Sequence, residues 1–209
     1  MDRPVKVIVP WRPDESRQEG LKWVVKYYEH RLGEGCIHLA VDDSKEPFNK
    51  SKLLNLAIAK YPGHVIVIAD ADCIICDHSL SRAVREVTDE EMICPHNRTC
   101  RTTKKQARWI LNQNPSSRVR GKWFIKTRSK PAVGGIWVIT HELFMKHRMD
   151  ERFEGWGHED GDFKDRVPHK RYQGPLFHIW HPPSSRKGTR RNSRIRNENL
   201  RKRKREAAK

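Results

Sequence analysis

Residues 65–72 read VIVIADAD, in which five consecutive apolar residues are followed by Asp70, Ala71 and Asp72. An apolar run of this length that stops at polar residues is typical of a strand buried on both faces, as in a parallel sheet. Two carboxylates after such a strand are hard oxygen ligands that suit Mg²⁺ or Mn²⁺. The segment therefore predicts a buried strand that ends at a cation site. Two solvated turn carboxylates are the alternative.

A strand and a helix, twice in succession, are predicted before this run. These elements are a strand at 5–9, a helix at 20–32, a strand at 36–41 and a helix at 49–61. Both helices have apolar residues that recur with helical spacing. A β-α-β-α-β order predicts a parallel sheet with right-handed crossovers.

Polar side chains follow all three predicted strands. Arg12 follows the first, Asp42 and Asp43 follow the second, and Asp70 and Asp72 follow the third. In open α/β sheets, ligands bind beyond the carboxyl ends of the strands. The sequence therefore predicts a nucleotide-binding cleft at this edge.

Two lysines, Lys50 and Lys52, stand in the first turn of the predicted helix at 49–61. The helix dipole disfavours cations there by about 0.3–1 kcal/mol each. An anionic ligand at the helix N-terminus would reverse that preference. The alternative is two solvated lysines.

Regular elements return after a polar stretch. They are a strand at 132–140, a short helix at 141–147, a helix at 159–167 and a last strand at 175–180. With the first half of the chain they predict an α/β fold, with a Rossmann-like, mostly parallel central sheet flanked by helices.

The last predicted strand ends in an H-x-x-H pattern, His178 and His181. If the chain turns there, both imidazoles can face one ion, and imidazole is a more usual ligand for Mn²⁺ than for Mg²⁺. Upstream, residues 154–162 read EGWGHEDGD and place acids at the start of a helix. Ordinary N-terminal capping is one interpretation. The other is a carboxylate that takes a proton from an acceptor hydroxyl, beside an indole face that suits a sugar or a base.

The net charge of +17 is concentrated in two segments. Residues 97–130 hold eleven Lys or Arg residues and no acid, with Trp109 and Trp123 between them, and residues 183–209 hold twelve and only two acids. The other 20 basic residues are outnumbered by 24 acidic ones. This distribution indicates a polyanionic partner. A mobile acceptor lid and a solubilising tail are the alternative.

The 209 residues suit one domain with an appendage. We expect a domain at 1–182, with 97–130 as a basic insert on the acceptor side. The tail at 183–209 has almost no apolar residues, so we expect it to be disordered, or helical only on a partner. No apolar run approaches the ~20 residues of a membrane span. A cytoplasmic protein without membrane contact is the expectation, and the oligomeric state stays open.

Cysteine spacing offers a weak case for zinc. Cys73, Cys76, Cys94 and Cys100 include one C-x-x-C pair, but the spacings match no common zinc knuckle. We expect reduced, packed thiols.

Taken together, these segments resemble a known family. The matching stretches, in order, are FNKSKLLNLA (48–57), VIVIADADCII (65–75), VGGIWVITHELF (133–144), FEGWGHEDGDF (153–163) and HIWH (178–181). They are similar to the β-1,4-galactosyltransferase and chondroitin-polymerase branch of the GT-A glycosyltransferases, over roughly residues 5–182. His158 departs from a glycine common in this family, and Gly161 departs from an acid.

The resemblance implies a metal-dependent, inverting hexosyltransferase that uses a UDP-sugar. It makes Asp72, His178 and His181 the ligands of Mn²⁺ or Mg²⁺, and Asp160 the catalytic base with Glu159 beside it. It assigns the donor to Pro10, Arg12, Asp42, Lys50, Asp70 and Trp156. It assigns the acceptor to Gly134 and Gly135.

The chemical identity of the acceptor is predicted from the distribution of charge and not from the resemblance. Two basic segments suggest DNA across the active face, with Trp109 and Trp123 stacking on a displaced base. Our first hypothesis is transfer to a hydroxymethylated base, as in some bacteriophage enzymes, reached by flipping or in single strands. A protein acceptor such as a capsid subunit, a glycan acceptor, and a non-catalytic nucleic-acid-binding module are the alternatives.

Overall fold

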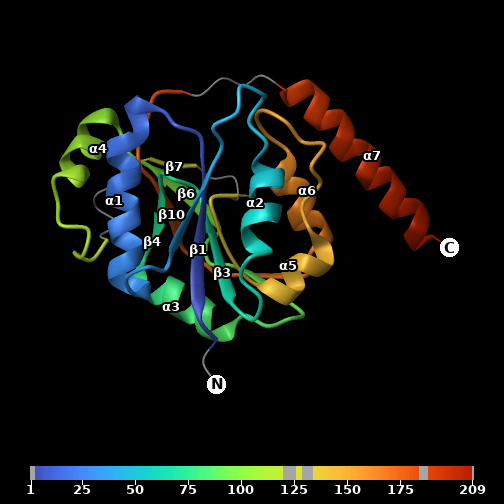
Figure 1. Cartoon of the computed structure of the whole chain (residues 1–209), viewed down its shortest axis with the longest axis horizontal. Helices are drawn as coiled ribbons and strands as arrows, with labels where there is room; N and C mark the ends of the chain where they lie inside the picture. The colour runs from blue at the N-terminus through green and yellow to red at the C-terminus, as the bar shows by residue number, and fades with distance from the viewer. Residues whose placement is uncertain (1–2, 120–125, 129–133, 184–187, 209) are drawn as a thin grey trace.

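The structure is a computed structural model, described here for residues 3–119, 126–128, 134–183 and 188–208. A six-stranded sheet in the order β2-β1-β3-β8-β5-β9 forms its centre (Figure 1). In chain order, its strands are β1 (Val5–Trp11), β2 (Ile37–Val41), β3 (Val65–Ala69), β5 (Met92–Cys94), β8 (Ile136–Thr140) and β9 (His169–Arg171). Three of the five strand pairs are parallel, so the predicted mostly parallel sheet is confirmed.

A second, four-stranded sheet in the order β4-β10-β6-β7 was not predicted. Its strands are β4 (Cys73–Ile75), β6 (Arg98–Arg101), β7 (Lys126–Arg128) and β10 (Pro175–His178). β10 pairs antiparallel with β4 and parallel with β6. The last strand of the domain is therefore joined to the segment that follows the two aspartates.

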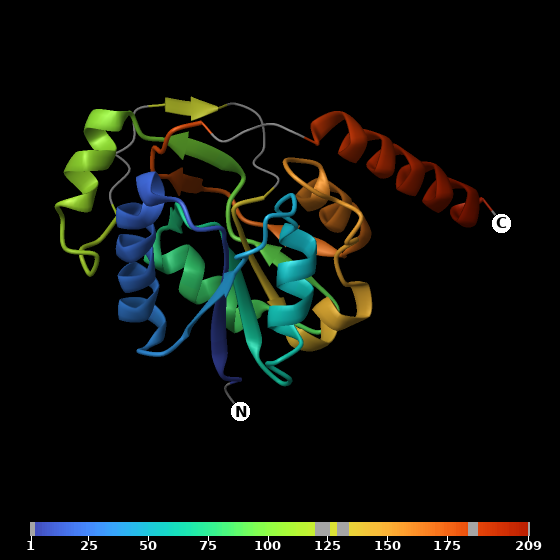
Figure 2. The same ribbon diagram turned by 45° about the horizontal axis from the view of Figure 1, so that its top comes forward.

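Helices cover both faces of the central sheet (Figure 2). The helices of the described residues are α1 (Glu15–Leu32), α2 (Lys50–Ile58), α3 (Asp77–Glu86), α4 (Lys104–Leu111), α5 (His141–His147), α6 (Glu159–Arg166) and α7 (Thr189–Ala207). Of these, α4 packs on α1 and α7 packs on α6. Alternate residues of each strand face opposite sides. Val7 and Val9 pack into the core beside α1, whereas Ile8 packs into the core beside α2 and α5. The apolar run at 65–69 is buried on both faces for the same reason.

The basic insert is more regular than its composition suggests. Within 97–130 the chain forms β6, α4 and β7, and α4 begins with a capping box between Thr103 and Gln106. The segment after α4 contacts α1, because Trp23 Nε1 donates to the carbonyl of Gln113 at 3.0 Å and Arg31 donates to the carbonyl of Pro115 at 2.8 Å.

The tail differs from the expectation of disorder. Residues 189–207 form α7, which packs on α6. Apolar burial is small, as the sequence indicates, but Arg196 pairs with Asp165 at 2.7 Å and Asn199 donates to Asp162 at 3.0 Å. We expected disorder because the segment has few apolar residues. Polar contacts hold its helix against the domain instead.

No helix in the described part of the chain has the length and apolar character needed to cross a membrane.

Candidate metal centre and active site

Asp72, His178 and His181 come together at the junction of the two sheets. Asp72 lies in the turn between β3 and β4, and β10 places His178 opposite Cys73. His181 Nε2 lies 3.1 Å from Asp72 Oδ2, and His178 Nε2 lies 3.6 Å from Asp72 Oδ1. Ligand atoms of all three lie within 4.8 Å of one another. One carboxylate and two imidazoles form a donor set that suits Mn²⁺.

Burial and neighbouring charges shift the pKa values of Asp72 and His178. Burial favours the neutral form of Asp72, but His178, His181 and Arg17 outweigh it and hold the pKa of Asp72 well below its ordinary value. Burial lowers the pKa of His178, although Asp72 opposes this, so the imidazole is neutral near pH 7. Its Nδ1 atom is buried without a hydrogen-bond partner.

Arg17, near the start of α1, was not predicted as part of the site. Its Nη2 donates to Asp72 Oδ2 at 2.5 Å, and its guanidinium lies over the Trp11 ring at 5.6 Å. The guanidinium therefore balances the Asp72 carboxylate from the side of the first strand. No local pattern in the sequence marks an arginine that meets an aspartate from a distant strand.

A second group of charges centres on Lys50. This lysine is only 9 % exposed, and its Nζ donates to Asp70 Oδ1 at 2.8 Å and to Asp160 Oδ1 at 3.0 Å. Lys50 is therefore not a solvated lysine. It joins the aspartate after β3 to the aspartate at the start of α6.

The two acids at the start of α6 have different environments. Asp160 shares the Lys50 ammonium, whereas Glu159 Oε2 is buried without a hydrogen-bond partner. Burial, followed by the charge of Asp160, raises the pKa of Glu159 to about 7. Burial also raises the pKa of Asp70, against the opposing charge of Lys50. Of the two acids at the start of α6, Asp160 is the one that Lys50 holds by a hydrogen bond.

Gly134 and Gly135 are required by close packing. A β-carbon at Gly134 would lie 1.8 Å from Asp160 Oδ2, so only glycine leaves room for that carboxylate. Gly135 has φ +105°, and a β-carbon there would lie 2.4 Å from Leu176. The Gly135 carbonyl accepts from the backbone N–H of Asp70 at 2.8 Å. The pair therefore fixes both aspartates, whereas the acceptor role predicted for it stays a prediction.

The loop at 154–157, which carries the half-exposed Trp156, is held by α7. Asn192 is fully buried, and its Nδ2 donates to the carbonyls of Glu154 at 2.9 Å and Gly157 at 3.0 Å. Its Oδ1 accepts from the backbone N–H of Glu154 at 3.4 Å. Sequence analysis missed Asn192 because it lies in the segment expected to be disordered.

The remaining donor residues lie at the ends of β1 and β2. Arg12 pairs with Asp42 and donates to the carbonyl of Glu46 at 2.7 Å, while Pro10 is buried in β1 beside Ala40. They form a separate pair from the Lys50 group, and their contact with a nucleotide stays a prediction.

Two other predictions concern Trp123 and the cysteines. Trp123 lies outside the described residues. The five cysteines are free thiols, and none belongs to a metal-ligand cluster within the described ranges.

Comparisons with known proteins agree with this geometry. A family model described as the N-terminal domain of galactosyltransferase matches residues 114–191, which include Asp160, His178 and His181. A search of curated proteins finds no match.

Solved structures are similar in fold at low sequence identity. β-1,4-galactosyltransferase 7 of Drosophila, solved with manganese, UDP-Gal and xylobiose, is 15 % identical, with a TM-score of 0.51 over 90 % of this chain and 79 % of that chain. Glucosyl-3-phosphoglycerate synthase of Mycobacterium tuberculosis, solved with Mn²⁺, UDP-glucose and phosphoglyceric acid, is 13 % identical, with a TM-score of 0.57 over 95 % and 78 %.

A mannosyltransferase of Pyrobaculum calidifontis, solved with GDP-Man and Mn²⁺, is 15 % identical, with a TM-score of 0.50 over 94 % of this chain and 61 % of that chain. The chain has the fold of the GT-A glycosyltransferases. The predicted fold is confirmed by the solved structures, and the family model agrees with the predicted resemblance to a glycosyltransferase.

Proposed function

We propose that this protein is a metal-dependent glycosyltransferase that moves a hexose from a UDP-sugar to an acceptor hydroxyl, with inversion at the anomeric carbon. The observation that carries the proposal is the meeting of Asp72, His178 and His181 within 4.8 Å, beside a second group that holds Asp160. The three similar structures described above were solved with Mn²⁺ and a nucleotide-sugar.

Asp72, His178 and His181 would hold the divalent ion. When bound, the ion neutralises the leaving diphosphate. The residues fit this role because one carboxylate and two imidazoles offer their ligand atoms within 4.8 Å of one another.

Asp160 would act as the general base. The acceptor oxygen forms a bond to the anomeric carbon, the bond from that carbon to the diphosphate oxygen breaks, and the hydroxyl proton passes to an Asp160 oxygen. Lys50 holds the carboxylate at 3.0 Å and Gly134 leaves room for it, so the base is positioned before the acceptor arrives. Trp156 offers a half-exposed indole face to the sugar.

For the acceptor, we propose a hydroxymethylated base in DNA. The support is the distribution of charge, since two basic segments belong to a chain whose other residues are slightly acidic. A base within a duplex would have to be flipped out to reach Asp160.

The test is sugar transfer measured by mass spectrometry. The protein is mixed with Mn²⁺, UDP-glucose or UDP-galactose, and either hydroxymethylated or plain DNA, and the nucleosides are analysed. We expect a hexose on hydroxymethylated nucleosides only, and none with the Asp72→Asn variant or with a chelator.

The test distinguishes a wrong acceptor from a wrong enzyme class. Release of UDP without labelled nucleosides would overturn the DNA acceptor and leave the transferase, and capsid protein and glycan acceptors would then be assayed. No metal-dependent consumption of either donor would leave a non-catalytic nucleic-acid-binding module and overturn the proposed enzyme.

A further inference from the structure

α7 has an inner face that is neutralised by the body of the protein. Arg196 pairs with Asp165 at 2.7 Å, and Arg203 lies 3.2 Å from Asp162. Asn192 on the same face binds the loop at 154–157. Each inner cation of the helix therefore has an acid of the domain as its partner.

The opposite face is a row of cations, which we call the basic stripe. With 100° per residue, the following exposed side chains fall on one side of the helix: Arg190, Arg194, Arg201, Lys204 and Arg205. Within the described ranges, none of the five has an acidic side chain within ion-pair distance. Of the two acids of α7, Glu206 lies on another side of the helix and faces Lys202 at 3.9 Å. Glu198 lies at the edge of the stripe, one turn from Arg194 and from Arg201, and faces Arg152 at 3.9 Å.

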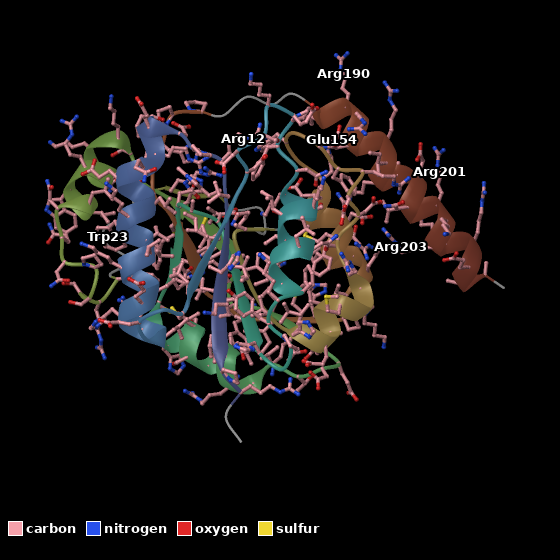
Figure 3. All side chains as sticks on the ribbon, in the orientation of Figure 1. Arg12, Trp23, Glu154, Arg190, Arg201 and Arg203 are labelled. Carbon is pink, nitrogen blue, oxygen red and sulfur yellow. The ribbon has the colours of Figure 1, made fainter. Side chains whose placement is uncertain are left out.

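Figure 3 shows this division of the helix. Arg190 and Arg201 point away from the body of the protein, whereas Arg203 points toward it. Glu154 lies near the first turn of the helix, so the stripe begins beside the loop that carries Trp156.

Like charges one turn apart oppose helix formation, as in the pairs Arg190 with Arg194 and Arg201 with Arg205. An anionic partner would relieve that repulsion. At 1.5 Å per residue the stripe is about 22 Å long. Guanidinium groups match phosphate oxygens with two parallel hydrogen bonds. A long, regularly charged phosphate backbone fits such a row.

The composition of the helix argues against a membrane surface as the partner. A helix that lies on a membrane needs an apolar face, but Ile195 of α7 is buried against the domain and the outer side is charged. We propose that the basic stripe of α7 binds the phosphate backbone of duplex nucleic acid and holds it beside the active site. The inference rests on the proposed function only in treating the bound polymer as the acceptor.

The test is binding of a labelled 20-base-pair duplex, measured by fluorescence anisotropy between 50 and 300 mM salt, without donor or metal. On duplex DNA, each phosphate contact contributes about −0.9 to the slope of log K against log salt. The Arg201→Gln/Arg205→Gln variant should therefore lose about 2 from the steepness of the slope and bind about 10-fold or more weakly at low salt.

The matched control is Lys22→Gln/Lys26→Gln. These two lysines are also exposed and one turn apart, on α1, and the variant loses the same charge. It should keep most of the affinity. Circular dichroism of both variants checks that α7 and the domain stay folded.

Equal losses of duplex affinity in the two variants would overturn binding by the basic stripe, because affinity would then depend on net charge alone. Competition by polyglutamate as effective as by duplex DNA would also overturn it, because an acidic protein would then be the better partner. Duplex binding that needs the stripe but brings no sugar transfer would support the stripe and count against the proposed acceptor. Sugar transfer to DNA with unchanged kcat/KM in the stripe variant would leave the enzyme and overturn the stripe.

Discussion

Replacing Gly134 by alanine should displace the carboxylate that we propose as the catalytic base. The new β-carbon would lie 1.8 Å from Oδ2 and 2.6 Å from Cγ of Asp160, whereas such contacts are essentially never under 3.0 Å. The carboxylate must therefore move by roughly 1 Å and lengthen its 3.0 Å bond to Lys50. A misplacement of about 1 Å costs about 10²-fold in rate, and losing the base costs about 10²–10⁴-fold. We expect kcat to fall by about 10²–10⁴.

The assay is kcat for sugar transfer, together with donor affinity measured by calorimetry. Donor affinity should change little, because Asp72 and both histidines are untouched. The control is Gly20→Ala, since a β-carbon at Gly20 within α1 meets nothing within 4 Å. That variant should keep full activity and gain a little stability, about 0.4–1 kcal/mol.

A double-mutant cycle decides the cause of the loss. In an Asp160→Ala background the carboxylate is gone, so Gly134→Ala should have little further effect. Equal losses in the two backgrounds would refute the reasoning, because the alanine would then act through the backbone rather than through Asp160.

Three further predictions concern the metal, the loop and pH. Asp72→Asn should weaken Mn²⁺ binding at least 10-fold in calorimetry while the protein stays folded, and unchanged Mn²⁺ affinity would exclude this aspartate as a ligand. Asn192→Ala leaves two loop carbonyls without their donor, so it should lower the free energy of unfolding in urea by about 1–3 kcal/mol and also lower kcat. The control is Asn197→Ala, an exposed position on the same helix, which should change neither quantity. Similar losses in both variants would contradict the role of Asn192. Because burial raises the pKa of Glu159 from 4.5 to about 7, the folded protein holds a proton that the unfolded chain releases, and this group removes stability as pH rises from about 4.5 to 7. Glu159→Gln should therefore become more stable relative to wild type over that interval, by a few kcal/mol at most, and a constant difference between the two would disprove it.

The central sheet could be predicted because its strands are uninterrupted apolar runs. The strand at 65–69 and the helix at 141–147 were predicted with the bounds that the structure has. α3 was not predicted because only a few of its residues are apolar, and the C-x-x-C pair before it was interpreted as a possible zinc site. α4 was missed because its lysines and arginine face outward and only Ala107 and Ile110 are buried.

The candidate site also contains residues that the sequence predicts and contacts that it does not. Residue type and position at strand ends were enough to select the three candidate metal ligands, because carboxylates and imidazoles are recognisable donors. The link from Lys50 to Asp70 and Asp160 could not be seen, since it depends on how α2 and α6 pack on the sheet. α7 could not be placed either, because its contacts with Asp162 and Asp165 are polar and leave no apolar pattern.

The pairing of β10 with β4 also sets the order in which the protein can mature. One ligand of the candidate ion belongs to the first half of the chain, and the other two arrive only with the final strand. A nascent chain that still lacks this strand contains only Asp72 of the three proposed ligands. One ligand is too few to retain Mn²⁺. Capture of the ion would therefore show that synthesis has passed the last strand and that β10 has paired with β4.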